Sequence, residues 1–289
     1  MRRLLVALTA LALVAIATGC DLRTMTPTGT APLRYRDAVF SKVTVTKDIA
    51  YRGAPLQDGT MVTLRLDVYR PTGDTVTKRP AIVWIHGGSF AAYDKTSGEI
   101  VNEATTLAKQ GYVGLSIDYR LDPVGCTNYG PQCIQAIRDA WHDAQAAVRF
   151  VRDHAAQYGV DPTRIAAAGT SAGAITAFNV GYGADDVGPG VTPTTSSKVR
   201  SVVSLSGAAL LTAPNPGEAA ALDFHGTADD LVPYSWSTST VDAAKKAGLT
   251  IERQTWEGAG HVPLQYMATI LSQTSNFLYW TMDLAHAAR

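Results

Sequence analysis

The chain has 289 residues, and its 25 Lys and Arg balance its 25 Asp and Glu, so the formal net charge is zero. There is no basic run or acidic tail, so the sequence gives no support for nucleic acid as a partner. The length is usual for a single α/β domain and sufficient to bury a large core. A net charge of zero does not argue against small uncharged molecules as substrates.

The first residues have the features of an export signal. Arg2 and Arg3 precede an apolar run over residues 4–17. This run is shorter than the ~20 residues that a membrane-spanning helix needs, which favours a signal peptide over residues 1–19. Ordinary cleavage after Ala17, at an A-x-A site, is the alternative and would give a freely secreted protein.

The end of this leader, Ala-Thr-Gly-Cys at residues 17–20, resembles a bacterial lipobox. The resemblance implies that Cys20 receives a lipid and becomes the mature N-terminus, anchoring the protein to the cell membrane on its extracytoplasmic side. Residues 20–34 are rich in Thr and Pro and are expected to form a tether. One folded domain is then predicted over residues 35–289.

Two further cysteines, Cys126 and Cys133, are separated by a short segment. An even pair in an exported protein usually forms a disulfide, which would rigidify the chain after Tyr119-Arg120. Two free thiols are the alternative. Neither cysteine has a histidine at the spacing of metal ligands, so no metal site is expected.

Strand and helix patterns alternate along the domain. Period-two alternation at residues 43–45 and 62–68 predicts an antiparallel pair. Continuous apolar runs predict buried strands at 81–85, 112–117, 164–168, 199–205 and 220–224, with a further strand at 251–256. An apolar stripe from Ile134 to Val151 predicts an amphipathic helix. The alternation predicts a mostly parallel sheet with helices on both faces and ligands beyond the carboxyl ends of the strands.

The first chemical motif is Gly-Thr-Ser-Ala-Gly at residues 169–173, which matches G-x-S-x-G. It follows the strand at 164–168 directly, and a helical segment begins at Ala172. This is the context of a nucleophile elbow, a sharp turn that exposes a serine hydroxyl, so Ser171 is the predicted nucleophile. The N–H of Ala172 is a predicted oxyanion donor. A glycine-rich turn without a catalytic role is the alternative.

Three more motifs follow predicted strands. They are His-Gly-Gly-Ser-Phe at residues 86–90, His-Gly-Thr-Ala-Asp-Asp-Leu-Val-Pro at 225–233 and Gly-Ala-Gly-His at 258–261. His261 is preferred as the base over His286, which lies near the end of the chain. Serine, then aspartate, then histidine is the chain order of the catalytic triad in α/β-hydrolases.

Together the four motifs resemble those of bacterial carboxylesterases of the α/β-hydrolase superfamily, related to hormone-sensitive lipase and to feruloyl and acetylxylan esterases. The resemblance covers nearly the whole chain after the leader. It implies Asp229 as the triad acid, with Asp230 as the alternative and Asp223 as a more distant one. It also implies that Gly88 and Ser89 supply the other oxyanion donors.

The predicted function is a serine carboxylesterase that acts on small-molecule esters with short acyl or accessible ester groups, without a cofactor or metal. Residues 206–219 are too short for a large cap, so the cap is predicted to be small or absent and the pocket open. The aromatic residues Phe90, Tyr93, Tyr129 and Tyr234 are candidates to line it.

Two alternative functions remain open. A serine peptidase of the prolyl-oligopeptidase type shares this catalytic domain, but such enzymes usually carry an N-terminal propeller, for which the sequence has no counterpart. A non-catalytic surface-binding lipoprotein is disfavoured by the intact set of Ser171, Asp229 and His261.

Overall fold

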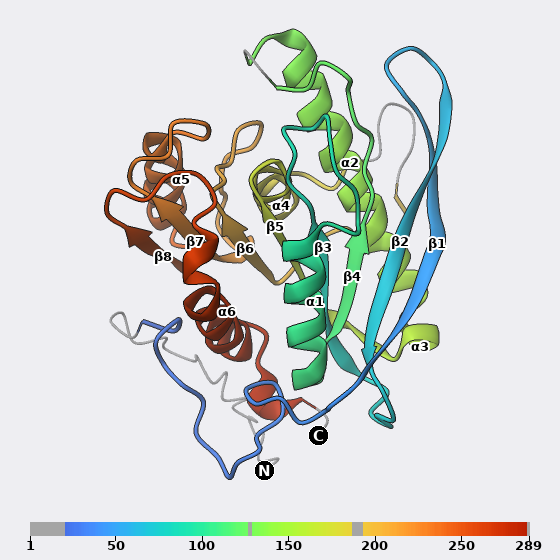
Figure 1. Cartoon of the computed structure of the whole chain (residues 1–289), viewed down its shortest axis with the longest axis vertical. Helices are drawn as coiled ribbons and strands as arrows, with labels where there is room; N and C mark the ends of the chain where they lie inside the picture. The colour runs from blue at the N-terminus through green and yellow to red at the C-terminus, as the bar shows by residue number, and fades with distance from the viewer. Residues whose placement is uncertain (1–20, 127–128, 187–192, 288–289) are drawn as a thin grey trace, which may run out of the picture.

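The computed structural model describes residues 21–126, 129–186 and 193–287, and their strands form one eight-stranded sheet (Figure 1). The strand order is β1-β2-β4-β3-β5-β6-β7-β8. The bounds are β1 Val43–Pro55, β2 Met61–Pro71, β3 Arg79–Ile85, β4 Val113–Ile117, β5 Val160–Thr170, β6 Ser201–Leu205, β7 Ala220–Gly226 and β8 Ile251–Trp256. β2 is antiparallel to both β1 and β4, and the pairs from β4 across to β8 are parallel. The predicted sheet of an α/β-hydrolase fold is confirmed.

Helices cover both faces of the sheet. The helices α1 (Gly98–Gln110) and α6 (Met267–Thr281) pack on one face and share a buried apolar cluster. The other face carries α2 (Pro131–Asp153), α3 (Ala155–Tyr158), α4 (Ala172–Tyr182) and α5 (Tyr234–Lys246). Single 3₁₀ turns at Leu264–Tyr266 and Leu284–His286 flank α6. This is the three-layer arrangement that alternating strands and helices predict.

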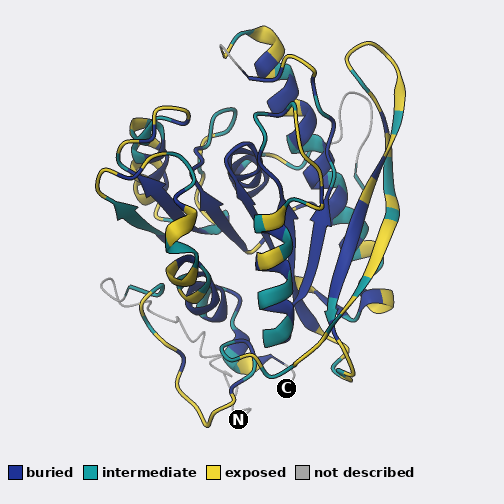
Figure 2. Cartoon of the chain, viewed as in Figure 1, coloured by how far each residue is buried: buried dark blue, intermediate teal, exposed yellow. Residues whose placement is uncertain are grey.

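Three strands inside the sheet are buried along their whole length, whereas the first edge strand is not (Figure 2). Every residue of β3, β4 and β6 is buried, while most of β1 is exposed or half-buried. Parallel strands between two helical layers need apolar side chains on both faces, which explains the continuous apolar runs. The sheet is thus a rigid platform for the loops at its carboxyl ends.

Helix α2 carries the predicted apolar stripe, with one difference at its start. Ala144, Val148 and Val151 are buried, but Ile134 is 39% exposed. The first turn of α2 projects beyond the sheet in Figure 1. The apolar period in the sequence predicts which side of a helix faces the core. It does not predict how far along the helix the sheet extends.

No large cap lies between β6 and β7. All of residues 206–219 are described, and they contain neither helix nor strand. The expectation of a small or absent cap is therefore met at this position.

Residues 21–25, the described start of the predicted tether, lie against the domain. The N–H groups of Leu22 and Arg23 donate to the Glu252 carboxylate of β8 at 2.6 and 2.8 Å. The Asn276 amide of α6 donates to the carbonyl of Arg23 at 3.0 Å. Within the part of the chain that the structure describes, none of the helices combines the length and apolar character needed to cross a membrane.

Candidate active site

Ser171 lies at the sharp turn between β5 and α4, where its backbone adopts φ 55° and ψ −116°. A positive φ is uncommon for a residue with a side chain, and such strain clusters at functional sites. The turn is held by the Ser171 N–H, which donates to the Leu205 carbonyl at 2.8 Å. Gly173 is required because a Cβ there would lie 1.9 Å from the Ile85 carbonyl oxygen. The predicted elbow geometry is present.

A chain of two hydrogen bonds links Ser171 to His261 and His261 to Asp229. The Ser171 hydroxyl lies 2.8 Å from His261 Nε2, and His261 Nδ1 lies 2.8 Å from Asp229 Oδ2. In the resting arrangement the serine donates to neutral Nε2 and the Nδ1–H donates to the carboxylate. The structure thus brings together the three side chains predicted as the triad, from three loops far apart in the sequence.

The Asp229 carboxylate is fully buried and richly hydrogen-bonded. Its Oδ1 accepts the N–H groups of Leu231 and Val232 at 3.1 and 3.0 Å. Burial alone would raise the pKa of Asp229, but hydrogen bonds from His225, His261 and the Val232 N–H outweigh it and hold the pKa well below its usual range. The acid is therefore a carboxylate throughout the physiological pH range.

The alternative acids and base lie elsewhere. Asp230 is exposed, one residue after the buried carboxylate. Asp223 is buried in β7 and accepts hydroxyl hydrogen bonds from Ser204, at 2.9 Å, and Ser237. His286 contacts only the nearby Asp283 among its ion-pair partners in the described residues, and its side chain is 80% exposed. The hydrogen bond to His261 therefore distinguishes Asp229 from Asp223 and Asp230 as the triad acid. The sequence motif alone does not make this distinction.

His225 lies directly beneath the triad acid, a role that sequence reasoning did not assign. Its Nε2–H points to the Val232 carbonyl at 2.9 Å and to Asp229 Oδ2 at 3.2 Å. Its Nδ1 lies 3.9 Å from Asp223 Oδ2. Burial opposes a charge on His225, but the two carboxylates outweigh it and raise its pKa to about 10. A buried imidazolium cation thus stabilises the negative charge on Asp229.

The predicted oxyanion donors line the same cavities as the serine. Gly88 and Ser89 follow β3 and have positive φ angles of 106° and 53°. Among the described residues no acceptor is found for their N–H groups, and Ala172, as the first residue of α4, has no intrahelical acceptor. Ser89 and Ser171 line the same cavities. Free backbone N–H groups beside the nucleophile are what an oxyanion requires.

His86 braces this loop rather than carrying protons. It is buried and stacks on Tyr119 with ring centroids 4.3 Å apart. Its Nδ1–H donates to the Gly87 carbonyl at 2.7 Å, and the Tyr119 hydroxyl lies 3.1 Å from the carbonyls of both His86 and Gly87. Burial lowers the pKa of His86 to about 4. The histidine is therefore neutral at pH 7.

Two residues near His261 were missed because no local motif marks them. Val262 has φ 50°, an outlier for a β-branched residue. Its N–H donates to the Ser206 hydroxyl at 3.0 Å, and Ser206 also has a positive φ. Ser206 follows β6, so a neighbouring strand end holds the strained backbone that presents the base. Only the folded structure places these two residues together.

Two cavities of unequal size meet at Ser171. The larger has a volume of about 500 Å³ and is lined by Tyr93, Glu99, His261 and Leu264 among others. The smaller has a volume of about 10 Å³ and includes Phe90 and Tyr129. The predicted lining aromatics thus divide between them, except Tyr234, which stacks against the Arg253 guanidinium. The larger space is of the size that holds small-molecule ligands.

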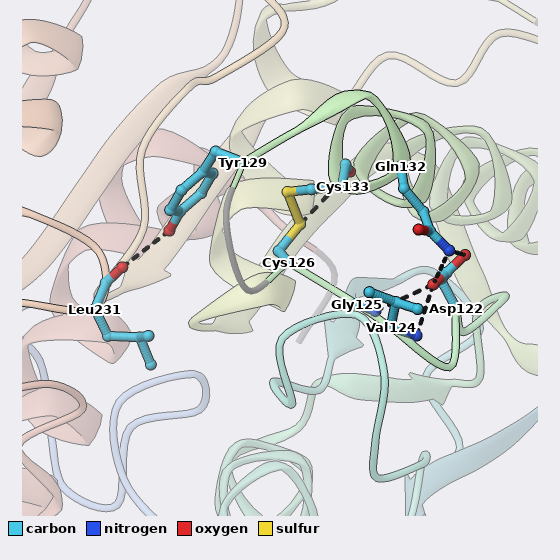
Figure 3. The surroundings of a disulfide bond; sticks show 8 residues. All are labelled: Asp122, Val124, Gly125, Cys126, Tyr129, Gln132, Cys133 and Leu231. Atoms are coloured by element: carbon cyan, nitrogen blue, oxygen red, sulfur yellow. Dashed lines mark hydrogen bonds between the residues drawn. A yellow bond between two sulfur atoms is a disulfide. The ribbon is translucent and has the colours of Figure 1, made fainter.

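The disulfide between Cys126 and Cys133 is present in the structure. It joins the loop after β4 to the first turn of α2 (Figure 3). Cys126 itself lines the smaller cavity. Of the other sequence predictions, the lipid-modified Cys20 lies outside the described residues. In the described part of the chain, no group of three or more His, Cys, Asp or Glu side chains is placed to hold a metal ion.

The nucleophile elbow, the ordered Ser-Asp-His set and the mostly parallel sheet define the class of the fold: the chain has the α/β-hydrolase fold. More narrowly, the chain belongs to the BD-FAE family, whose model matches residues 66–220, more than half of the sequence. The matched region includes Gly88, Ser89 and Ser171 and ends before Asp229. The family resemblance expected from the motifs is confirmed.

Curated relatives match a shorter region. The chain is 39% identical over 115 residues to phenmedipham hydrolase of Pseudarthrobacter oxydans, covering 38% of this chain and 21% of that protein. It is 37% identical over 112 residues to carboxylesterase 3B of Mus musculus, covering 38% of this chain and 19% of that protein. The match therefore spans about a fifth of the length of these relatives.

Solved structures match over most of the chain. One is Thermogutta terrifontis esterase 2 phosphorylated by paraoxon, which is 27% identical with a TM-score of 0.68. The alignment covers 89% of this chain and 99% of that one. The likeness therefore extends over most of the fold.

Proposed function

We propose that the protein is a serine carboxylesterase that hydrolyses small-molecule esters through an acyl-enzyme on Ser171. The observation that carries the proposal is the unbroken hydrogen-bond chain from the Ser171 hydroxyl through His261 to buried Asp229. The proposed oxyanion donors are the N–H groups of Gly88 and Ser89, for which the described residues show no acceptor, and that of Ala172, which has no intrahelical acceptor as the first residue of α4. Nucleophile, base, acid and oxyanion donors are the parts that acyl transfer needs.

The reaction proceeds in two transfers. His261 Nε2 accepts the Ser171 proton while Oγ bonds to the ester carbonyl carbon, and the carbonyl oxygen becomes an oxyanion held by backbone N–H groups. The oxyanion collapses, the C–O bond to the alcohol breaks, and His261 returns its proton to the leaving oxygen. Water then adds to the acyl-enzyme by the same route and releases the carboxylic acid and Ser171.

The names of the relatives support this chemistry. A hydrolase, a carboxylesterase and an esterase phosphorylated by paraoxon are all similar to this chain. An organophosphate that phosphorylates an esterase is an electrophile of the kind that an activated serine attacks. The same reactivity is proposed here for Ser171.

The test compares wild type with Ser171→Ala in two assays. A fluorophosphonate probe should label the wild type and leave the variant unlabelled, and equal labelling would refute an activated Ser171. Hydrolysis of p-nitrophenyl acetate should greatly exceed that of an aminoacyl p-nitroanilide. The reverse preference would identify a serine peptidase, and a wild type that is labelled no better than Ser171→Ala and turns over neither substrate would indicate a non-catalytic binding lipoprotein.

We also propose that the mature protein is an exported lipoprotein anchored through Cys20, as the lipobox-like residues 17–20 suggest. The two acyl chains of such an anchor suffice for stable attachment, whereas a single chain is marginal. The ester substrate would then be met on the extracytoplasmic side of the membrane. Mass spectrometry of the mature N-terminus tests this, because an unmodified Thr18 start would instead identify a freely secreted protein.

A further inference from the structure

The backbone that carries two of the proposed oxyanion donors is strained at two consecutive residues. Ser89 and Phe90 have φ angles of 53° and 62°. Residues with a side chain rarely adopt a positive φ, and they keep it only where the surrounding structure holds them in place. The contacts of these two residues therefore decide whether the oxyanion loop, residues 87–92, keeps its shape.

This strained conformation sets the direction of the Ser89 N–H. The chain turns back there, and the N–H groups of Ala91 and Ala92 donate to the Gly88 carbonyl at 2.9 and 3.1 Å. A trans peptide is planar, so its N–H points away from its own carbonyl. Holding the Gly88 carbonyl on one side therefore holds the Ser89 N–H on the other, where the described residues offer it no acceptor.

The supporting segment, residues 122–126, binds the carbonyl groups of both strained residues. The Asp122 N–H donates to the Phe90 carbonyl at 2.8 Å, and the Cys126 N–H donates to the Ser89 carbonyl at 3.0 Å. These two hydrogen bonds fix the peptide planes on either side of Phe90. The positive φ angles of the oxyanion loop are thus held from outside the loop.

The Asp122 carboxylate gives the supporting segment its shape (Figure 3). It is buried, and its Oδ1 accepts the N–H groups of Val124 and Gly125 at 2.8 and 3.1 Å. The Gln132 amide of α2 donates to its two oxygens at 3.0 and 3.1 Å. An aspartate that accepts the N–H groups two and three residues further on closes a tight turn. This turn places the N–H groups of Asp122 and Cys126 against the oxyanion loop.

The supporting segment is itself fixed and lies very close to the oxyanion loop. Besides the Gln132 amide, the disulfide from Cys126 to Cys133 joins it to the first turn of α2. Gly125, where φ is 60°, permits the close approach, because a Cβ there would lie 2.5 Å from the Ser89 carbonyl oxygen. A change in the shape of the supporting segment must therefore reach the oxyanion loop.

We propose that Asp122 is a positioning residue that keeps the Ser89 N–H directed at the oxyanion, acting through the carbonyls of Ser89 and Phe90. The proposal rests on the proposed esterase function. Asp122 is not among the described residues that line the two cavities at Ser171, so it acts on the reaction only through the loop. Because the oxyanion forms only during the reaction, a misdirected donor should lower kcat and kcat/KM together and leave KM nearly unchanged.

The test is steady-state hydrolysis of p-nitrophenyl acetate by Asp122→Ala, with kcat expressed per serine labelled to completion by a fluorophosphonate. kcat should fall about tenfold, less than the 10²–10³-fold loss of a whole donor, while KM stays within about twofold. Asp122→Asn keeps an oxygen for the Val124 and Gly125 N–H groups and should retain kcat within about threefold. Gly125→Ala tests the same contact should Asp122→Ala fail to fold, and it should also lower kcat about tenfold, because its Cβ must displace the Ser89 carbonyl.

Asp161→Ala is the matched control. Asp161 is a buried aspartate whose Oδ1 also accepts an N–H two residues further on, that of Thr163 at 2.9 Å. It lies at the start of β5, at the opposite end of that strand from Ser171. Its loss should lower the free energy of unfolding and leave kcat within about twofold of wild type.

A double-variant cycle with Gly88→Ala separates positioning from a general loss of stability. If Asp122 acts through the oxyanion loop, a loop already displaced by Gly88→Ala should lose less than about threefold more in kcat when Asp122→Ala is added. An unchanged kcat in both Asp122→Ala and Gly125→Ala, or a loss that recurs in full in the Gly88→Ala background or in Asp161→Ala, overturns the proposal. Hydrolysis that is equal in wild type and Ser171→Ala would instead overturn the esterase function itself.

Discussion

Two His-Gly pairs stand at the carboxyl ends of β3 and β7, on opposite sides of β5 in the sheet, and their histidines differ in charge. Both His86 and His225 are buried. Burial lowers the pKa of His86 to about 4. Burial also opposes a charge on His225, but two carboxylates raise its pKa to about 10.

The residues around each histidine, and not the His-Gly dipeptide itself, determine the difference in charge between His86 and His225. His86 packs on the ring of Tyr119 and hydrogen-bonds to the Gly87 carbonyl, so its surroundings are neutral. His225 lies between Asp223 and Asp229. The β3 side of the site therefore offers uncharged N–H donors to a developing oxyanion, and the β7 side holds a permanent carboxylate for His261.

The largest expected effect comes from removing the charge on the β7 side. Asp229→Asn keeps the shape of the side chain but loses the carboxylate that accepts the His261 Nδ1–H, so kcat should fall about 10⁴-fold. Asp230→Asn, at the exposed neighbour, is the matched control and should keep kcat within about twofold. Steady-state hydrolysis of p-nitrophenyl acetate measures both, and similar losses in the two variants would refute Asp229 as the acid.

Distorting the neutral donors on the β3 side should have the next largest effect. A Cβ on Gly88, where φ is 106°, would lie 2.2 Å from the Ala92 carbonyl oxygen, so Gly88→Ala must move the loop. Loss of an oxyanion donor predicts a fall in kcat of about 10²–10³-fold. Gly98→Ala is the control: it lines the same cavity, and its Cβ would meet no atom of the described residues within 4 Å. Equal activities of the two variants would contradict the oxyanion role.

Removing the buried cation should have a smaller effect on rate and a distinctive effect on stability. His225→Asn takes one hydrogen bond and one positive charge from Asp229, so kcat should fall about tenfold. The raised pKa of His225 contributes stability that is complete below its unfolded value near 6.5 and is lost as the pH rises through about 10.

Urea unfolding of wild type and His225→Asn at several pH values tests this charge state. The deficit of the variant in free energy of unfolding should be on the order of 2–4 kcal/mol at pH 6 and should shrink toward pH 10. A deficit that is constant over this range would mean that His225 is neutral in the native protein.

The smallest effect is expected from the brace on the neutral side. Tyr119→Phe removes the buried hydroxyl that lies 3.1 Å from the carbonyls of His86 and Gly87, so the free energy of unfolding should fall by about 1 kcal/mol. Unlike the His225→Asn deficit, this loss should be the same at pH 6 and pH 9, because no charge is involved. A pH-dependent loss in the free energy of unfolding of Tyr119→Phe would contradict the proposed difference in charge between His86 and His225.

Much of the fold was predictable because buried parallel strands leave continuous apolar runs in the sequence. The runs at 81–85 and 220–224 lie within β3 and β7. Strand order was not predictable from these runs, since β3 lies between β4 and β5 for reasons of packing across the whole sheet. The projecting first turn of α2, with Ile134 exposed, depends likewise on where the sheet ends.

The residues of the site also fall into two groups: those that the sequence predicts and those that only the structure reveals. Ser171 and His261 were predictable from local motifs and chain order, because the elbow needs glycines at fixed positions around the serine. The preference for Asp229 over Asp230 needed a family resemblance, and the structure supports it by distance. The charge on His225 and the contact between Val262 and Ser206 depend on distances between strand ends, which no local pattern encodes.

The most direct test of the whole account is to trap the acyl-enzyme. Wild type mixed with p-nitrophenyl acetate and quenched in acid within the first turnover should carry one acetyl group, and peptide mass spectrometry should locate it on Ser171. Ser171→Ala, treated in the same way, should carry none. An acetyl group on another residue, or rapid hydrolysis with no acetyl-enzyme and with activity retained in Ser171→Ala, would contradict the proposed nucleophile.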